Sequence, residues 1–157
     1  MIAKFFKDKV VTPIIKLLKQ GITPEKISLC IALGVMLGVF PVLGSTMILC
    51  TIASFAFKLN LPLIQLISYL VYPMQILFLI PFIRFGEWML NVSPFPISIE
   101  ALVDMIKTDI WQTIITFWDA TMHGIFGWLI ISCIMIPLLY FAFLPLLKRI
   151  PIKGLKE

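Results

Sequence analysis

Residues 27 to 57 form a long apolar run without a charged side chain, and a lysine stands directly at each end of it. As one straight helix, the run would measure about 46 Å, whereas the hydrocarbon core of a bilayer is about 30 Å thick. Its centre contains Pro41 and Gly44, residues that interrupt helices. We therefore predict a broken, re-entrant helical hairpin over about 24–58, with arms of roughly 20 Å that turn inside the bilayer.

A second arrangement in the membrane would also accommodate this apolar run. Two short but complete crossings, with the turn at the outer surface, would return Lys58 to the side on which the run begins. The two arrangements differ only in the depth of the turn. We favour the re-entrant hairpin because arms of roughly 20 Å are shorter than the hydrocarbon core.

The composition of the chain places this hairpin in a membrane protein. Of its 157 residues, 61% are hydrophobic and 13% are charged, whereas soluble domains are about 45–50% apolar and about 25% charged. A soluble chain of this composition would expose a large apolar surface to water. We therefore expect an all-α integral membrane protein with a single membrane domain over 1–157.

Two further segments are long and apolar enough to cross the bilayer. Residues 124–147 form an uncharged transmembrane helix, and residues 61–88 form a second one. Asn60 is the expected N-cap of the second helix, with Pro62 in its first turn. Two internal prolines, Pro73 and Pro81, predict that this helix is proline-broken.

An amphipathic pattern separates these two crossings. Ser98 can cap a helix over 98–122 whose apolar residues share one face. Those residues are Ile99, Leu102, Val103, Ile106, Ile110, Ile114, Phe117 and Trp118. We expect this helix to rest on the outer surface of the membrane or to pack across the bundle, and a binding surface on the outer side is the other use of such a face.

Charge and tryptophan positions indicate the same orientation. Basic residues predominate in the first 26 residues and from 148 onward, whereas acidic residues predominate from 87 to 119. Basic segments stay on the cytoplasmic side, and tryptophan favours the membrane–water boundary. The tryptophans, Trp88, Trp111, Trp118 and Trp128, lie in or beside the acidic stretch. We expect cytoplasmic N- and C-termini and an extracytoplasmic segment over about 89–123.

The first 20 residues predict a basic helix in the membrane interface. Apolar side chains recur there at helical spacing, and lysines separate them, which is typical of a helix that binds anionic membrane lipids. The lysines are Lys4, Lys7, Lys9, Lys16 and Lys19. A polar leader that only sets the orientation is the alternative, and both interpretations place the segment in the cytoplasm.

The hairpin turn is the candidate binding site. A turn at membrane depth must be covered by protein or water, and its second arm presents free N–H groups and a positive dipole end to an anion. The candidate site residues are Pro41, Gly44, Ser45 and Thr46. The alternative is that the turn only folds the hairpin. Helix-packing roles are expected for Gly34 and Gly38, and a helix start is expected at Thr23 and Pro24.

Catalytic and metal chemistry has no support in the sequence. Cys30, Cys50 and Cys133 lie far apart in apolar runs, and His123 has no partner at ligand spacing. We therefore expect no enzyme activity, no metal and no cofactor, and we expect no nucleic-acid partner.

A family resemblance is carried by two stretches, GITPEKISLCIALGVMLGVFPVLGSTMIL and LNLPLIQLISYLVYPMQ. They resemble the bacterial membrane family called domain of unknown function 2062. The shared pattern is G-x-x-P, a glycine-spaced helix, a P-x-x-G turn and an N-x-P start of a proline-broken segment. Its residues here are Gly21, Pro24, Gly34, Gly38, Pro41, Gly44, Asn60, Pro62 and Pro73.

The resemblance covers about 20–90 closely and the helices over 98–147 more loosely. Tyr72 departs from the pattern, because family members often have asparagine there. The resemblance implies a prokaryotic inner-membrane protein without an established activity. Some members are fused to glycosyltransferases of the dolichol-phosphate-mannose type, a domain that this chain lacks, so the implied setting is that of lipid-linked sugars.

Two functions fit these observations. The first is transport or handling of an anionic lipid-linked substrate, such as a polyprenyl phosphate, at the hairpin turn, with a homo-oligomer formed through Gly34 and Gly38. The second is a non-catalytic membrane anchor or scaffold for a partner enzyme of cell-envelope glycan or lipid synthesis, such as a glycosyltransferase.

Overall fold

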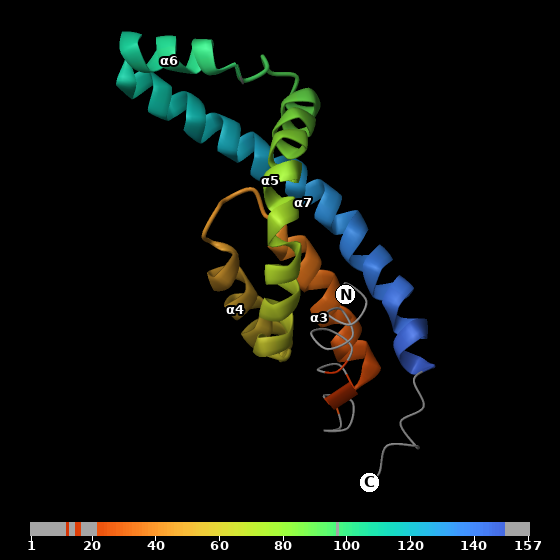
Figure 1. Cartoon of the computed structure of the whole chain (residues 1–157). Coiled ribbons are helices and arrows are strands. Elements are labelled where there is room, and N and C mark those ends of the chain that lie inside the picture. Colours follow the sequence, from red (N-terminus) through yellow and green to blue (C-terminus); the bar gives the residue numbers. More distant parts are fainter. Residues whose placement is uncertain (1–11, 13–14, 17–21, 97, 150–157) are drawn as a thin grey trace, which may run out of the picture.

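The computed structural model describes residues 12, 15–16, 22–96 and 98–149. Its elements are α3 (Pro24–Gly38), α4 (Thr46–Phe57), α5 (Leu61–Leu90), α6 (Ile99–Thr108) and α7 (Ile110–Lys148), drawn in Figure 1. No strand occurs within the described ranges, so the predicted all-α class is confirmed. Of the expected basic interfacial helix, the lysines Lys4, Lys7, Lys9 and Lys19 lie outside the described residues, whereas Lys16 is helical and exposed.

The predicted hairpin is present as two short helices. α3 and α4 have 15 and 12 residues, about 22 Å and about 18 Å of helix, and each is shorter than a bilayer core of about 30 Å. Residues 39–45 connect them, so both expected breakers lie in the turn. Lys58 ends α4 in a left-handed conformation (φ 52°), and the chain then enters α5.

α3 is the most buried helix in the described part of the chain. It contacts α4, α5 and α7, and most of its residues are buried. Ile27 and Ala32 have no exposed surface. The apolar side chains of α3 therefore face other helices on several sides, whereas those of α5 and α7 face mostly outward.

α5 and α7 are long and apolar enough to cross a membrane. Only 22% of the most apolar stretch of α5 and 6% of that of α7 is buried. In a soluble protein, a helix that is apolar on all sides is buried in the core. α5 and α7 are apolar but mostly exposed, which matches the expected membrane class.

The expected break within 61–88 is wrong. α5 is one continuous helix of 30 residues, about 45 Å long, with Pro73 and Pro81 inside it. A proline removes one backbone hydrogen bond from a helix but leaves the ladder intact on both sides. Packing of α5 against α3 and α7 keeps the two sides in one helix.

The expected boundary between an amphipathic helix over 98–122 and a helix over 124–147 is also wrong. The chain breaks at Asp109, where α6 ends and α7 begins. The Asp109 carboxylate accepts hydrogen bonds from the N–H groups of Trp111 (2.9 Å) and Gln112 (3.1 Å). This N-cap starts a helix of 39 residues that passes through Gly124 without interruption.

Glycines allow α5 and α7 to cross in close contact. A Cβ atom on Gly86 would lie 1.9 Å from the carbonyl oxygen of His123, and one on Gly127 would lie 2.4 Å from that of Phe82. No larger side chain fits at either position without moving a backbone. Figure 1 shows the crossing in the middle of the molecule, with α6 folded back along the first part of α7.

The pair Arg84 and Glu87 does more than the modest helix-face pair that its spacing suggests. Arg84 Nη1 lies 3.0 Å from Glu87 Oε2, and the Glu87 side chain is only 4% exposed. The other oxygen, Oε1, accepts a hydrogen bond of 2.7 Å from the backbone N–H of Phe95. Glu87 therefore fastens the loop after α5 to the end of that helix.

Candidate binding site at the hairpin turn

Side-chain caps set the starts of α3 and α5. Thr23 Oγ1 accepts a hydrogen bond from the backbone N–H three residues later (3.4 Å), and Asn60 Oδ1 does the same (3.0 Å). Each helix also has a proline in its first two positions, Pro24 and Pro62. The two helices start at the same end of the molecule and run side by side toward the turn (Figure 1).

Gly34 and Gly38 pack against α5 of the same chain. A Cβ atom on Gly34 would lie 2.9 Å from the Cβ atom of Ile67, and one on Gly38 would lie 3.0 Å from the Cα atom of Ser68. The sequence suggested these glycines as the surface for a second copy of the chain. That assignment is corrected, because α5 already covers both positions.

Gln75 holds the turn from the middle of α5. Its side chain is fully buried, and its Nε2 donates a hydrogen bond to the carbonyl of Phe40 and lies 3.4 Å from that of Val42. Both are carbonyls of the turn, so the amide nitrogen faces the turn and Oε1 faces away from these acceptors. Oε1 has no hydrogen-bond partner within the described ranges.

Sequence reasoning did not assign a role to Gln75. The available signal was its position, a lone amide in the middle of an apolar segment, because polar side chains at membrane depth are costly and tend to be functional. The missing information was the location of its partners, 35 and 33 residues earlier in the chain.

Trp128 attaches α7 to the last turn of α3. Its Nε1 donates a hydrogen bond of 2.8 Å to the carbonyl of Met36, and its ring meets that of Phe40 edge-on at 4.8 Å. The sequence assigned Trp128 to the membrane boundary. In the structure the indole is partly buried and packs against the hairpin.

The candidate site residues occupy different surroundings around the turn. Pro41 is buried, and the space beside its ring is bounded by Gly124 of α7. Gly44 has a φ of 85°, and an added Cβ would meet no atom within 4 Å. Ser45 Oγ donates a hydrogen bond of 2.8 Å to the carbonyl of Val42 and does not cap α4. The Ser45 proton is therefore already used within the turn.

Thr46 is the candidate residue with unused hydrogen-bonding capacity. It is 3% exposed, and its Oγ1 has no partner among the residues that the structure describes. It is also the first residue of α4, whose opening N–H groups have no acceptor within the helix and no cap from Ser45. Together these groups offer several donors at the start of α4.

An apolar cavity of about 320 Å³ adjoins the turn. It lies between the turn, the second half of α5, the loop after α5 and the first half of α7. Its lining residues include Val42, Leu43, Ile83, Phe95 and Phe117. A hydrocarbon chain would be a suitable occupant of such a cavity, because its walls are almost entirely apolar.

The fold and the turn together define a class: an all-helical protein with two helices of membrane-spanning length around a hairpin that is broken at its centre. The chain belongs to the uncharacterised bacterial protein family DUF2062, whose profile matches residues 10–154. The match extends well beyond 20–90 and includes α6 and α7. No curated protein and no solved structure matches the chain.

Proposed function

We propose that the chain binds and handles an anionic lipid-linked substrate, of the polyprenyl-phosphate kind, at the turn between α3 and α4. The observation that carries this proposal is the buried Thr46 Oγ1, which has no hydrogen-bond partner among the described residues and stands at the start of α4. Buried polar atoms are normally paired, so an unpaired hydroxyl beside the free N–H groups of a helix start supports a polar ligand at the turn.

The donors at the turn suit a phosphate. The first N–H groups of α4 carry the positive end of the helix dipole, and the Thr46 hydroxyl can add a donor. Gly44 lets the ligand approach the backbone, because no side chain stands there. The adjoining apolar cavity is a place for the first part of the lipid chain.

The turn would lie at membrane depth. Gln75 is about 20 Å along α5 from the start of that helix, whereas a bilayer core is about 30 Å thick. α3, α5 and the hydrogen bonds from Gln75 and Trp128 would provide the cover that non-helical backbone needs there. Broken helices that expose a helix end near the bilayer centre are the usual substrate sites of secondary transporters.

We further propose a multi-pass location in the bacterial inner membrane, with both termini in the cytoplasm. α3 and α5 start, and α7 ends, at the same end of the molecule (Figure 1), which supports this orientation. Lys148, in the basic C-terminal cluster, pairs with Glu25 at this end (2.9 Å). Trp88, Trp111 and Trp118 are exposed toward the opposite end, which suits the extracytoplasmic boundary.

The test is a binding titration of the full chain in mild detergent with a short-chain polyprenyl phosphate. Thr46→Val keeps the shape of the side chain and removes the hydroxyl. A hydrogen bond to a charged group contributes about 1.5–3 kcal/mol, so we expect affinity to fall at least about tenfold. Thr51→Val, on the exposed face of the same helix, is the matched control and should bind as the wild type does.

The polyprenol without its phosphate separates the headgroup from the lipid chain. It should bind more weakly than the phosphate to the wild type and equally to wild type and Thr46→Val. Equal binding of alcohol and phosphate, or unchanged phosphate binding by Thr46→Val, would rule out the turn as a headgroup site.

A scaffold role is the second candidate, and α6 is the observation that favours it. Among the larger helix contacts of the described residues, α6 contacts only α7, and its side chains Val103 and Ile106 are exposed. A partner enzyme could dock there without using the turn. Ile106→Glu should then release a co-purifying partner, whereas Thr46→Val should retain it.

A further inference from the structure

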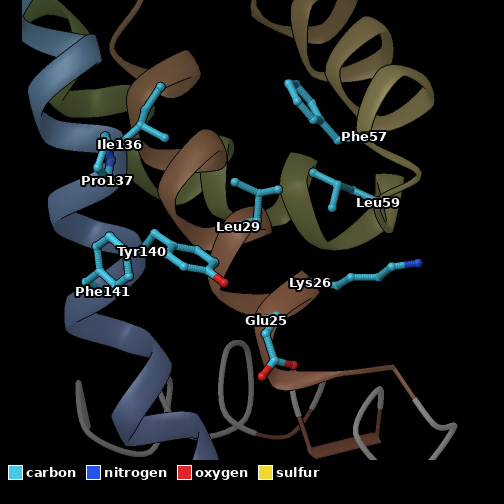
Figure 2. A pocket seen from close by; sticks show the side chains of 9 residues that line it. All are labelled: Glu25, Lys26, Leu29, Phe57, Leu59, Ile136, Pro137, Tyr140 and Phe141. Atoms are coloured by element: carbon cyan, nitrogen blue, oxygen red, sulfur yellow. The ribbon is translucent and has the colours of Figure 1, made fainter.

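A second apolar groove lies at the opposite end of the hairpin from the turn. It has a volume of about 400 Å³, which lies within the range of ligand pockets. Leu29 of α3 forms its floor, the Phe57–Leu59 link from α4 to α5 forms one wall, and the stretch Ile136–Phe141 of α7 forms the other. Figure 2 shows these side chains around a space between α3, α4 and α7.

The groove exists because α4 and α7 flank α3 without packing on each other. α3 contacts both helices, whereas the larger contacts of α4 in the described part of the chain are with α3 and α5. Pro137 presents its ring to the groove, and Phe141 at the rim is 67% exposed. These apolar walls would be in contact with water in a soluble protein, but they suit a hydrocarbon chain.

The mouth of the groove carries polar groups that favour an anion. Lys26 lines the groove at this end and forms no ion pair within the described ranges. In Figure 2 its ammonium points away from α7, past Leu59. Glu25 also lies there, but Lys148 Nζ is 2.9 Å from its carboxylate and offsets that charge. Tyr140 extends from α7 across the groove toward this charged end (Figure 2), so its hydroxyl can serve as a donor.

From these observations we propose that the groove is a binding site for one anionic phospholipid of the leaflet at which α3 begins. An acyl chain occupies the apolar part between Leu29 and Phe141, and the phosphate lies at Lys26. The apolar walls of the groove match the acyl chain of such a lipid, and the lysine matches its negatively charged headgroup. The site is separate from the turn, and the proposal does not depend on a headgroup site there.

Native mass spectrometry of the full chain from mild detergent tests the proposal, with phosphatidylglycerol and phosphatidylcholine added at equal concentration. One basic residue near a membrane surface favours an anionic lipid by about fivefold. We expect the wild type to retain phosphatidylglycerol over phosphatidylcholine by about that factor. Lys26→Ala should abolish the preference.

Arg149→Ala is the matched control, because it removes a positive charge at the same end of the molecule from a residue that does not line the groove. It should keep the preference. Phe141→Ala should lower retention of both lipids severalfold, whereas Phe126→Ala, the same change elsewhere on α7, should not. Thr46→Val should leave retention unchanged, which separates this site from the turn.

Three results would overturn the proposal. Arg149→Ala could lower the preference as much as Lys26→Ala, which would indicate general surface charge. Phe141→Ala could leave both lipids bound as in the wild type, which would place the acyl chain elsewhere. Thr46→Val could abolish phosphatidylglycerol retention, which would move the lipid to the turn.

Discussion

The buried amide of Gln75 donates a hydrogen bond to the carbonyl of Phe40, which lies 35 residues earlier in the chain. Phe40 follows the end of α3, where carbonyl groups lose their helical donors. A buried carbonyl without a hydrogen-bond donor typically destabilises the folded state by about 1–3 kcal/mol. Gln75 supplies the donor from the middle of α5 and so attaches the turn to that helix.

Gln75→Leu should destabilise the hairpin. It removes the donor to Phe40 and Val42 while keeping much of the side-chain volume, so the expected loss is about 1–3 kcal/mol. The thermal midpoint in detergent should fall clearly below that of the wild type. Gln112→Leu, a change at an exposed position of α7, should leave the midpoint close to the wild-type value. Equal midpoints for both variants would show that Gln75 does not hold the turn.

Gly86→Ala should prevent the close crossing of α5 and α7. The added Cβ would lie 1.9 Å from the carbonyl oxygen of His123, and a backbone cannot yield as a flexible side chain can. Overpacking costs about 1–3 kcal/mol or more, so we expect a large loss of folded protein by size-exclusion chromatography. Gly44→Ala is the comparison, because it meets no neighbour and carries only the strain of a positive φ, of order 1–3 kcal/mol.

Glu87→Ala should release the loop that follows α5. The variant removes the acceptor of the Phe95 N–H and leaves the Arg84 guanidinium without its partner. Hydrogen exchange at the Phe95 amide should therefore become faster, by roughly tenfold for a lost contribution of about 1.4 kcal/mol. Glu100→Ala, at an exposed position of α6, should leave that exchange rate unchanged.

The stability of the bundle should depend on pH through Glu25. The hydrogen bond from the Lys148 ammonium holds the pKa of the Glu25 carboxyl below its ordinary value. A carboxyl with a lowered pKa in the folded state stabilises that state above its ordinary pKa, and this contribution disappears as the pH falls through the lowered value.

Thermal midpoints measured from about pH 6 down to about pH 3 check this dependence. The wild type should lose more stability over this range than Lys148→Met, in which Glu25 has no partner. Identical pH profiles of the two proteins would contradict a stabilising role for the pair.

Thiol labelling tests the proposed orientation. In a Cys133→Ala background, Ser93→Cys places a thiol in the exposed loop after α5, and Lys58→Cys places one at the opposite end. A membrane-impermeant maleimide should label Ser93→Cys in intact cells and should label Lys58→Cys only after the membrane is opened. The reverse pattern would invert the topology.

The sequence by itself determined the helical class, the hairpin and its break. A charge-free run too long for one crossing, with Pro41 and Gly44 at its centre, specifies two short arms because helix length and helix breaking are local properties. The starts of α3 and α5 were likewise readable at Thr23 and Asn60, since a cap acts on a backbone N–H only three residues away.

Local patterns were less reliable where a second effect competed with them. Pro73 and Pro81 predicted a break, yet packing on both sides keeps α5 continuous. The apolar face over 98–122 predicted one helix, yet the short-range cap at Asp109 divides it. In both places the outcome depended on the size of one effect relative to another, which periodicity does not measure.

Only the tertiary structure decided what the turn and the glycines contact. Gly34 and Gly38 face α5 of the same chain, Gly86 and Gly127 mark a crossing of distant helices, and Gln75 and Trp128 reach the hairpin from α5 and α7. Each of these contacts joins residues that are far apart in sequence. Such pairings depend on how whole helices lie against one another, so no local spacing along the chain encodes them.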